Sequence, residues 1–309
     1  MSKILEDALI MSTHRLSFYK KIAVSISGGA DSDMIIDITE KTKNKGNEIN
    51  YVFFDTGLEY EATKEHLKYL EERYAVKITT LRPEQPIPIC TRKYGQPFLS
   101  KHVSDMIGRL QSHNFKWENK TFDELYKEYP TCKCALLWWC NGHPKNSMFN
   151  IEYNKFLKEF MLSNIPYFKI SDKCCHYNKK ILIKKYIKEN KIQLDVTGVR
   201  KAEGGKRSVN IKSCFSAKPN GRFSFRPVFW FTNEVKKEYN KNYNIINSKC
   251  YTEYGLKRTG CAGCPFGQQF EYELEVLKKY ETRLYNAVIN VFKESYAYTR
   301  DYKIFRKEG

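Results

Sequence analysis

The sequence lacks any long hydrophobic run, because no apolar stretch among its 309 residues approaches the roughly 20 residues that a membrane span needs. Residues 1–15 carry acidic side chains and lack the basic start and unbroken apolar stretch of a secretory signal peptide. Internal repeats and low-complexity tracts are also missing. With 41% hydrophobic residues, the chain has enough apolar material for a packed core. We therefore expect a globular, cytoplasmic protein that does not engage a membrane.

Acidic residues are few compared with basic ones. Lys and Arg number 53 against 35 Asp and Glu, which gives a formal charge of +18. One interpretation is solubility together with the Lys-, Asn-, Ile- and Tyr-rich composition of an AT-rich genome. The other is an anionic partner, such as a nucleotide or a nucleic acid. Charge alone leaves both interpretations open.

The first third of the chain alternates strand and helix patterns. Residues 21–27 are mostly apolar and rich in β-branched side chains, as expected for a buried parallel strand. The polar loop 27–32 follows at once and leads into a helix. Two more strands are predicted at 50–54 and 76–81, with a helix over 61–74 between them. This order predicts an α/β fold with a parallel sheet and right-handed crossovers.

The patterns along the whole chain predict two domains. We expect residues 1–235 to form a nucleotide-binding α/β domain with an insert at about 100–165, and residues 236–309 to pack on it as a cysteine-bearing segment with an amphipathic helix. Further elements are predicted in the rest of the sequence: helices at 151–162, 181–190 and 270–292, and a strand at 193–199.

The loop between the first strand and its helix has the composition of an anion trap. Its sequence is Ser27-Gly28-Gly29-Ala30-Asp31-Ser32. Paired glycines allow close approach of the backbone and positive φ, and the amides at a helix start donate to phosphate oxygens, here aided by the hydroxyls of Ser27 and Ser32. The alternative is an ordinary glycine-rich turn, which the position directly after a buried strand disfavours. The loop lacks the Gly-Lys-Ser/Thr ending of a Walker loop.

Four motifs resemble a known family. SGGADS resembles the PP-loop of the adenine nucleotide α-hydrolase superfamily, and FFDTGLEYEATKEHLKYL is similar to the second motif of the phosphoadenosine-phosphosulfate (PAPS) reductase family. GVRKAEGGKR resembles the family's Gly-x-Arg-x-x-Glu…Arg segment, and RPVFWF…CAGCPFG follows its closing stretch. The similarity covers about residues 20–267 apart from the insert. It implies a HUP-like parallel sheet flanked by helices, with a C-terminal cysteine-bearing loop and helix.

The resemblance also implies the nucleotide site. Its ligand would be ATP, or PAPS or adenosine phosphosulfate (APS), with Mg²⁺ held in part by Asp31 or Asp55. Arg200, Lys201 and Arg207 would face phosphate or sulfate, and Asp31, Arg200 and Arg207 would be catalytic. The implied nucleotide contacts are Ser27, Gly28, Gly29, Asp31, Ser32, Asp55, Thr56, Gly57, Gly198, Arg200 and Lys201.

Ten cysteines, several in close pairs, indicate metal or redox chemistry rather than disulfides in a cytosolic chain. The adjacent Cys174-Cys175 with a distant Cys261-x-x-Cys264 resembles the [4Fe–4S] signature of one sulfonucleotide-reductase branch. Four thiolates are what a cubane cluster needs. A structural zinc site and unliganded buried thiols remain alternatives. A second group of possible ligands, with a spacing that matches no recognised pattern, is Cys132, Cys134, Cys140 and His143.

Three functions follow from these patterns. The first is ATP-dependent activation with sulfur transfer to a nucleic acid or small acceptor, with a cysteine desulfurase as sulfur source. The second is sulfonucleotide reduction with a thiol reductant. Because no cysteine follows Cys264, where the family's reductases carry a nucleophile near the C-terminus, this would need a non-standard cysteine. The third is a non-catalytic nucleotide- or nucleic-acid-binding module, supported by Ala30, where many relatives carry Lys.

Overall fold

The structure, a computed structural model, describes residues 2–204, 211–218, 221–267 and 269–308. The chain forms two compact units. Unit 1 contains Met1–Pro83 and Lys179–Cys261, and unit 2 contains Glu84–Asn178 and Ala262–Gly309. The predicted boundary at residue 235 falls inside unit 1, so these units and the predicted domains divide the chain differently. Among the described helices, none has the length and apolarity to cross a membrane.

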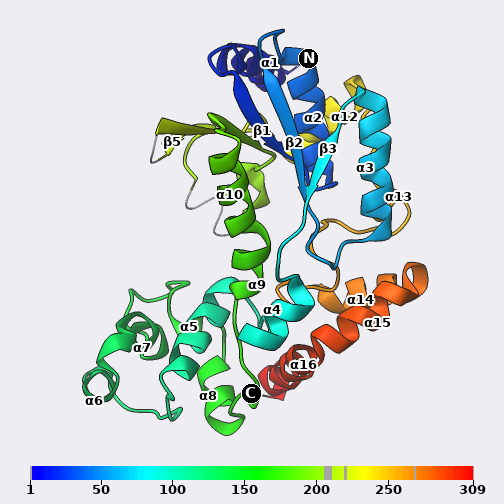
Figure 1. The fold of residues 1–309 in the computed structure, drawn as a ribbon. Coiled ribbons are helices and arrows are strands. Elements are labelled where there is room, and N and C mark those ends of the chain that lie inside the picture. Colours follow the sequence, from blue (N-terminus) through cyan, green and yellow to red (C-terminus); the bar gives the residue numbers. More distant parts are fainter. Residues whose placement is uncertain (1, 205–210, 219–220, 268, 309) are drawn as a thin grey trace. The chain divides into compact units, whose positions relative to one another are not determined.

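Unit 1 is built on a six-stranded sheet in the order β3-β2-β1-β4-β6-β5 (Figure 1). All neighbouring strands pair in parallel except β5 and β6, which form an antiparallel edge. The predicted α/β class with a mostly parallel sheet is confirmed. The strands are β1 (Lys21–Ser25), β2 (Glu48–Phe54), β3 (Ile78–Leu81), β4 (Leu194–Thr197), β5 (Phe215–Lys218) and β6 (Arg222–Phe225).

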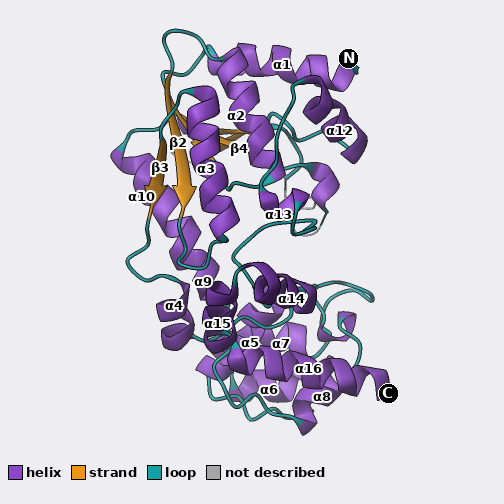
Figure 2. Ribbon diagram, turned by 90° about the vertical axis from the view of Figure 1, so that its right-hand side faces the viewer, coloured by secondary structure: helices purple, strands orange, loops and turns teal. Residues whose placement is uncertain are grey.

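Helices cover both faces of this sheet, as Figures 1 and 2 show. Because side chains alternate along a strand, Ile22 and Val24 of β1 join the larger core, whereas Ala23 packs with Ile187 and Ile192 on the other face. Residues of α1, α2, α3 and α12 fill the larger core, and α10 covers the opposite face. The unit 1 helices are α1 (Lys3–Leu16), α2 (Ala30–Thr42), α3 (Glu61–Tyr74), α10 (Ile181–Glu189), α12 (Asn233–Asn242) and α13 (Lys249–Thr252).

Unit 2 has its own hydrophobic core, rich in aromatic side chains. Trp138 and Trp139 are completely buried and belong to the same core as Phe160, which contacts Tyr298 of α16. The predicted helix at 151–162 is a 3₁₀ turn followed by α8, and the predicted helix at 270–292 is two helices separated at Glu281. The helices are α4 (Ile87–Tyr94), α5 (Lys101–Ser112), α6 (Phe122–Glu128), α7 (Lys133–Trp139), α8 (Leu157–Ser163), α9 (Lys173–Cys175), α14 (Phe270–Tyr280), α15 (Thr282–Val291) and α16 (Lys293–Glu308).

Candidate functional site

Three predicted motifs follow three neighbouring strands of unit 1. The phosphate loop 27–32 follows β1, Asp55-Thr56-Gly57 follows β2, and Gly198 directly follows β4. β2, β1 and β4 are adjacent and parallel, so their carboxyl ends lie at one edge of the sheet. Ligands of open α/β sheets bind in the crevice at this edge. Unit 1 therefore brings these sequence-predicted residues together.

The phosphate loop needs its glycines because other chain segments approach it closely. Gly28 has φ +65°, and a Cβ there would lie 2.6 Å from Cγ2 of Thr63. A Cβ on Gly198 would lie 2.9 Å from the carbonyl oxygen of Asp31. The hydroxyl of Ser32 donates to the carbonyl of Gly29 over 2.7 Å, so it closes the loop. α2 then begins at Ala30, which sets its first amides at the loop.

Asp31 is neutralised by two cations of unit 1. Its Oδ1 accepts from Nε of Arg200 over 3.0 Å and from Nζ of Lys236 over 2.6 Å. Arg200 is 7% exposed and also donates to the carbonyl of Phe231 over 3.2 Å. The predicted anion-facing arginine is thus held beside the start of α2 by the predicted catalytic aspartate. Nothing in the local sequence around Lys236 signalled its part in this site.

The two other basic residues of the arginine segment differ in their setting. Lys201 is exposed, and its ammonium lies 5.1 Å from the centre of the Trp230 ring, a cation–π distance. Its backbone amide donates to the carbonyl of Phe229 over 2.8 Å. Arg207, the remaining predicted catalytic residue, lies outside the described residues.

The Asp-Thr-Gly motif joins a buried carboxyl to a thiol. The hydroxyl of Thr56 donates to Oε1 of Glu59 over 2.6 Å, and its oxygen lies 3.5 Å from Sγ of Cys261. Burial raises the pKa of Glu59, and the positive charge of Lys179 and the bonds from Thr56 oppose that rise only in part. Glu59 stands two residues after Gly57 and is part of the second motif. Nothing in the sequence indicated that this glutamate would be buried rather than exposed at the start of a helix.

Asp55 pairs with one exposed cation. Its Oδ1 accepts from the amide of Gly57 over 3.1 Å, and its Oδ2 accepts from Nε of Arg82 over 3.2 Å. The Arg82 side chain is 78% exposed and the Asp55 side chain 18% exposed, and an ion pair with one partner in water contributes little stability. Asp55 is thus engaged by one weakly held cation, whereas Asp31 is engaged by two.

Two hydroxyls cover the phosphate loop. The Tyr251 and Thr259 oxygens lie 2.9 Å apart, and a Cβ on Gly29 would come within 3.1 Å of each. Burial raises the pKa of Tyr251, and bonds from Thr259 and from the Ala30 backbone partly offset the rise. Both residues belong to the stretch before Cys261, and their role at the loop was not predicted.

The four predicted cluster ligands are divided between the units. Cys261 ends unit 1, whereas Cys174, Cys175 and Cys264 belong to unit 2. A π-helical turn, His176–Lys180, follows the cysteine pair, a local structure frequent at functional sites.

In the Cys-x-x-Cys loop, Gly263 has φ +59° and its carbonyl accepts from the hydroxyl of Tyr296. Within the described part of each unit, no group of three or more His, Cys, Asp or Glu side chains is placed to hold a metal ion. The cluster therefore stays a prediction from cysteine spacing. The same holds for the second group, Cys132, Cys134, Cys140 and His143.

A parallel α/β sheet with a glycine-rich loop after β1 and Asp-Thr-Gly after β2 defines an adenine nucleotide α-hydrolase-like protein of the PP-loop class. The sequence matches the phosphoadenosine phosphosulfate reductase domain over residues 21–266. The chain belongs to this family, and the predicted resemblance is confirmed. Membership supports an enzyme of this superfamily.

Similarity to individual proteins is lower. An uncharacterized protein of Methanocaldococcus jannaschii, MJ0066, is 42% identical over 65 residues, which are 21% of this chain. The chain spans only 13% of that relative's length. Among solved structures, a PAPS reductase from Candida auris in a phosphate complex has 12% identity and a TM-score of 0.45, with coverage of 84% of this chain and 96% of the other.

Two further solved structures show comparable similarity. The U34-tRNA thiolase NcsA from Methanococcus maripaludis, with its [4Fe-4S] cluster, has 10% identity and a TM-score of 0.41, with coverage of 98% of this chain and 79% of that chain. An NH3-dependent NAD synthetase from Campylobacter jejuni, in complex with nitrate, has 11% identity and a TM-score of 0.40, with coverage of 96% of each chain.

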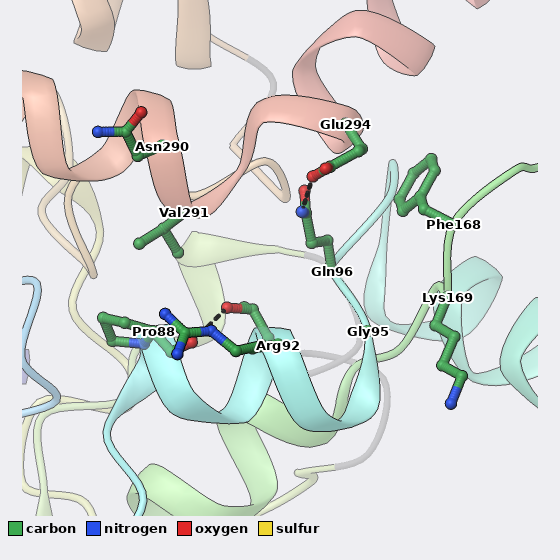
Figure 3. A pocket seen from close by; sticks show the side chains of 10 residues that line it. Pro88, Arg92, Gly95, Gln96, Phe168, Lys169, Asn290, Val291 and Glu294 are labelled. Carbon is green, nitrogen blue, oxygen red and sulfur yellow. Dashed lines mark hydrogen bonds between the residues drawn. The ribbon is translucent and has the colours of Figure 1, made fainter.

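Unit 2 contains a cavity of about 420 Å³, shown in Figure 3. Gln96 and Glu294 point toward one another across it and are hydrogen-bonded. Gln96 also accepts from the backbone amide of Ser295 over 3.0 Å. Because these polar groups satisfy one another, they do not indicate a ligand specific to this cavity.

Proposed function

We propose that this protein is an ATP-dependent enzyme that activates an acceptor by adenylation and then transfers sulfur to it, with a nucleic acid as the acceptor. The observation that carries the proposal is the 3.5 Å approach of Cys261 Sγ to Thr56 Oγ1, in the second nucleotide motif. It supports the proposal because a sulfur nucleophile and the nucleotide motifs then share one edge of one sheet.

The nucleotide phosphates would bind the amides at the start of α2 and the backbone of Gly28 and Gly29. Ala30 stands where many relatives carry Lys, so it supplies no positive charge. Arg200 and Lys236 supply that charge instead, because both are hydrogen-bonded to Asp31 in the first turn of α2. Since Asp31 is engaged by two cations, Asp55 is the better carboxylate for the Mg²⁺ that accompanies ATP. Mg²⁺, when bound, neutralises phosphate charge.

The proposed chemistry has two steps. In the first, an acceptor oxygen forms a bond to the α-phosphorus of ATP, the bond to the bridging oxygen breaks, and pyrophosphate leaves. In the second, a cysteine desulfurase system has placed sulfane sulfur on the Cys261 thiol, and the outer sulfur of this persulfide bonds to the activated centre while AMP leaves with the oxygen and its electron pair. A dithiol reductant then cleaves the disulfide between the acceptor and Cys261, which frees the thiolated acceptor and the Cys261 thiol and leaves the dithiol oxidised.

The nucleic-acid acceptor is supported by a basic face formed by α10 and Lys180, the residue just before it. Lys180, Lys184 and Lys188 recur at four-residue steps, which puts them on one side of a helix at intervals of about 6 Å. All three are exposed, and no carboxylate of the described residues pairs with them. Closely spaced lysines of this kind bind a phosphate backbone.

Iron–sulfur binding rests only on the spacing of the four cysteines and is an alternative role for Cys261, because a thiolate that ligates a cluster would not carry the transferred sulfur. Metal analysis after anaerobic purification tests it. Iron and acid-labile sulfide in equal amounts, lost together in Cys174→Ser, would support the cluster. A colourless protein with stoichiometric zinc would contradict it.

Product analysis tests the reaction. The protein would be incubated with ATP, Mg²⁺, a cysteine desulfurase with cysteine as sulfur source, a dithiol reductant and pooled tRNA or DNA, and pyrophosphate, AMP and acceptor-bound sulfur would be measured. Acceptor-dependent pyrophosphate release supports the proposal, and Asp31→Ala should abolish it. Nucleotide binding without turnover under any of these conditions would contradict it and favour a binding module.

A second candidate is sulfonucleotide reduction, which family membership favours. A cysteine thiolate would bond to the sulfur of PAPS or APS, displacing the nucleotide, and a thiol reductant would release sulfite from that bond. Sulfite formed from PAPS or APS with a dithiol, and no acceptor-dependent pyrophosphate from ATP, would establish this reaction instead.

A further inference from the structure

A groove of about 640 Å³ lies in unit 2, in the region that matches no recognised motif. None of its lining residues belongs to the nucleotide motifs of unit 1. Its lining comes from the end of α4, from α5 and the residues just after it, and from segment 166–173. Its volume is within the range of small-ligand sites, which suits individual nucleotides and excludes a duplex.

The floor of this groove is rigidly fixed. A Cβ on Gly95 would lie 2.3 Å from the carbonyl oxygen of Lys169, and a Cβ on Gly108 would lie 2.7 Å from that of Ile170. Gln111 binds the segment on both sides, since its Nε2 donates to the carbonyl of Phe168 and its Oε1 accepts from the amide of Ile170, each over 2.8 Å. The groove is therefore preformed, and a ligand would not have to order it.

The lining contains both aromatic rings and basic groups. Tyr167 is 68% exposed. Tyr94 lies with the ammonium groups of Lys93 and Lys173 at 5.2 and 5.3 Å from its ring centre. The basic side chains of the groove are Lys93, Arg109, Lys169 and Lys173.

The acidic side chains of the groove are fewer. They are Asp105, which pairs with Arg109 over 3.0 Å, and Asp172. In Figure 3 the Lys169 side chain extends away from Gln96 and Glu294, so its ammonium group is directed away from the hydrogen-bonded pair of the neighbouring cavity. The groove thus keeps an excess of positive charge beside exposed ring surface.

We propose that this groove binds a short single-stranded stretch of nucleic acid, with a base stacked on Tyr167 and phosphates contacting Lys93, Lys169 and Lys173. Stacking platforms bordered by basic groups are how proteins hold single strands with little sequence preference. The inference rests on the proposed function and deepens it by giving its acceptor a binding site. The segment that forms the groove ends at Lys173, immediately before Cys174-Cys175.

Fluorescence anisotropy with the full chain and a short fluorescein-labelled single strand, as RNA and as DNA, tests the proposal. Tyr167→Ala should weaken binding of the preferred strand about tenfold, the usual loss of one stacked base. The double variant Lys93→Gln, Lys169→Gln should bind with a weaker salt dependence. The slope of log binding constant against log salt concentration should become less steep by about 0.7 for each lost phosphate contact. The matched controls are Tyr153→Ala and Lys145→Gln, both exposed in unit 2 outside the groove, and neither should change binding.

Two outcomes would overturn the groove assignment. One is binding that Tyr153→Ala weakens as much as Tyr167→Ala. The other is that polyglutamate displaces the labelled strand as effectively as unlabelled strand does. That result would show that the groove binds any polyanion, including an acidic protein, rather than a nucleic acid. Failure of the proposed reaction can be distinguished from failure of the groove assignment. If the protein binds the strand but releases no acceptor-dependent pyrophosphate, the proposed reaction is wrong and the binding site stands.

Discussion

Arg200 donates from Nε to Oδ1 of Asp31 over 3.0 Å, and this bond connects the segment after β4 to the first turn of α2. The guanidinium side chain is 8% exposed and the carboxylate side chain 21% exposed, so both charges are mostly withdrawn from water. A buried charge without its partner is costly. The phosphate loop therefore depends on a residue that lies far away in the sequence.

Asp31→Asn should destabilise the protein by about 3 kcal/mol, because it leaves the buried Arg200 without a counter-charge. Urea unfolding of both proteins gives this difference in the free energy of unfolding. The control is Glu65→Gln, which breaks an exposed ion pair with Lys249 and should cost less than about 1 kcal/mol. Equal effects of the two changes would show that the Asp31 pairs do not stabilise the loop.

Cys261→Ser should lower sulfur incorporation at least about a hundredfold, as expected for removal of a group that reacts directly, and leave nucleotide affinity nearly unchanged. Isothermal titration with a non-hydrolysable ATP analogue and sulfur-labelled product give the two values. Cys214→Ser is the control, since Cys214 is also half-buried in unit 1. A fully active Cys261→Ser would remove the observation that carries the proposed function.

Glu59→Gln should flatten the dependence of stability on pH. Burial raises the pKa of Glu59 above its ordinary value of 4.5, against the opposing Lys179 charge and Thr56 bonds, with Asp55 adding to the rise. The folded chain then keeps a proton that the unfolded chain has lost, so stability falls as pH rises from 4.5 through the folded pKa.

A glutamine side chain has no carboxyl proton to lose, so the Glu59→Gln variant should be less sensitive to this rise in pH. Urea midpoints taken at a series of pH values measure the difference between the two proteins. If both profiles have the same slope above pH 4.5, Glu59 is ionised in the folded chain and the assigned direction is wrong.

Gly108→Ala should destabilise unit 2, although the same change in an open helix adds about 1 kcal/mol of stability. The new Cβ would lie 2.7 Å from the carbonyl oxygen of Ile170, so the groove floor must move, at a cost of about 1–3 kcal/mol. Thermal unfolding of this variant is compared with that of Gly260→Ala, whose Cβ would meet no heavy atom within 4 Å. A stabilised Gly108→Ala would show that segment 166–173 is not held as described.

Local patterns were sufficient to predict the nucleotide half of the fold. The helix expected at 61–74 is α3 with the same bounds, and the strand at 21–27 is β1, because alternating burial and helix periodicity are properties of neighbouring residues. The antiparallel β5–β6 edge was not predicted, since nothing local shows that Phe215 will pair with Phe225. Pairing across the sheet depends on the whole chain.

The candidate site was predictable only where residues follow a strand directly. Ser27–Ser32 and Asp55-Thr56-Gly57 carry such a signal, whereas Lys236 and Tyr251 reach the loop from helices late in the chain. Unit 2 presents a similar limit, because the contact of Phe160 in α8 with Tyr298 in the late helix α16 joins segments far apart in the sequence and depends on tertiary structure.

The discontinuous course of unit 1 has a consequence for biosynthesis. β1 pairs with β4, and the ribosome delivers β4 only after the whole of Glu84–Asn178 has been made. At about 5–20 residues per second, the β4 side of β1 stays open for on the order of ten seconds in each nascent chain. An open strand edge is a template for wrong pairing. We therefore expect chaperones to bind nascent chains that have not yet reached Leu194 more than the finished protein.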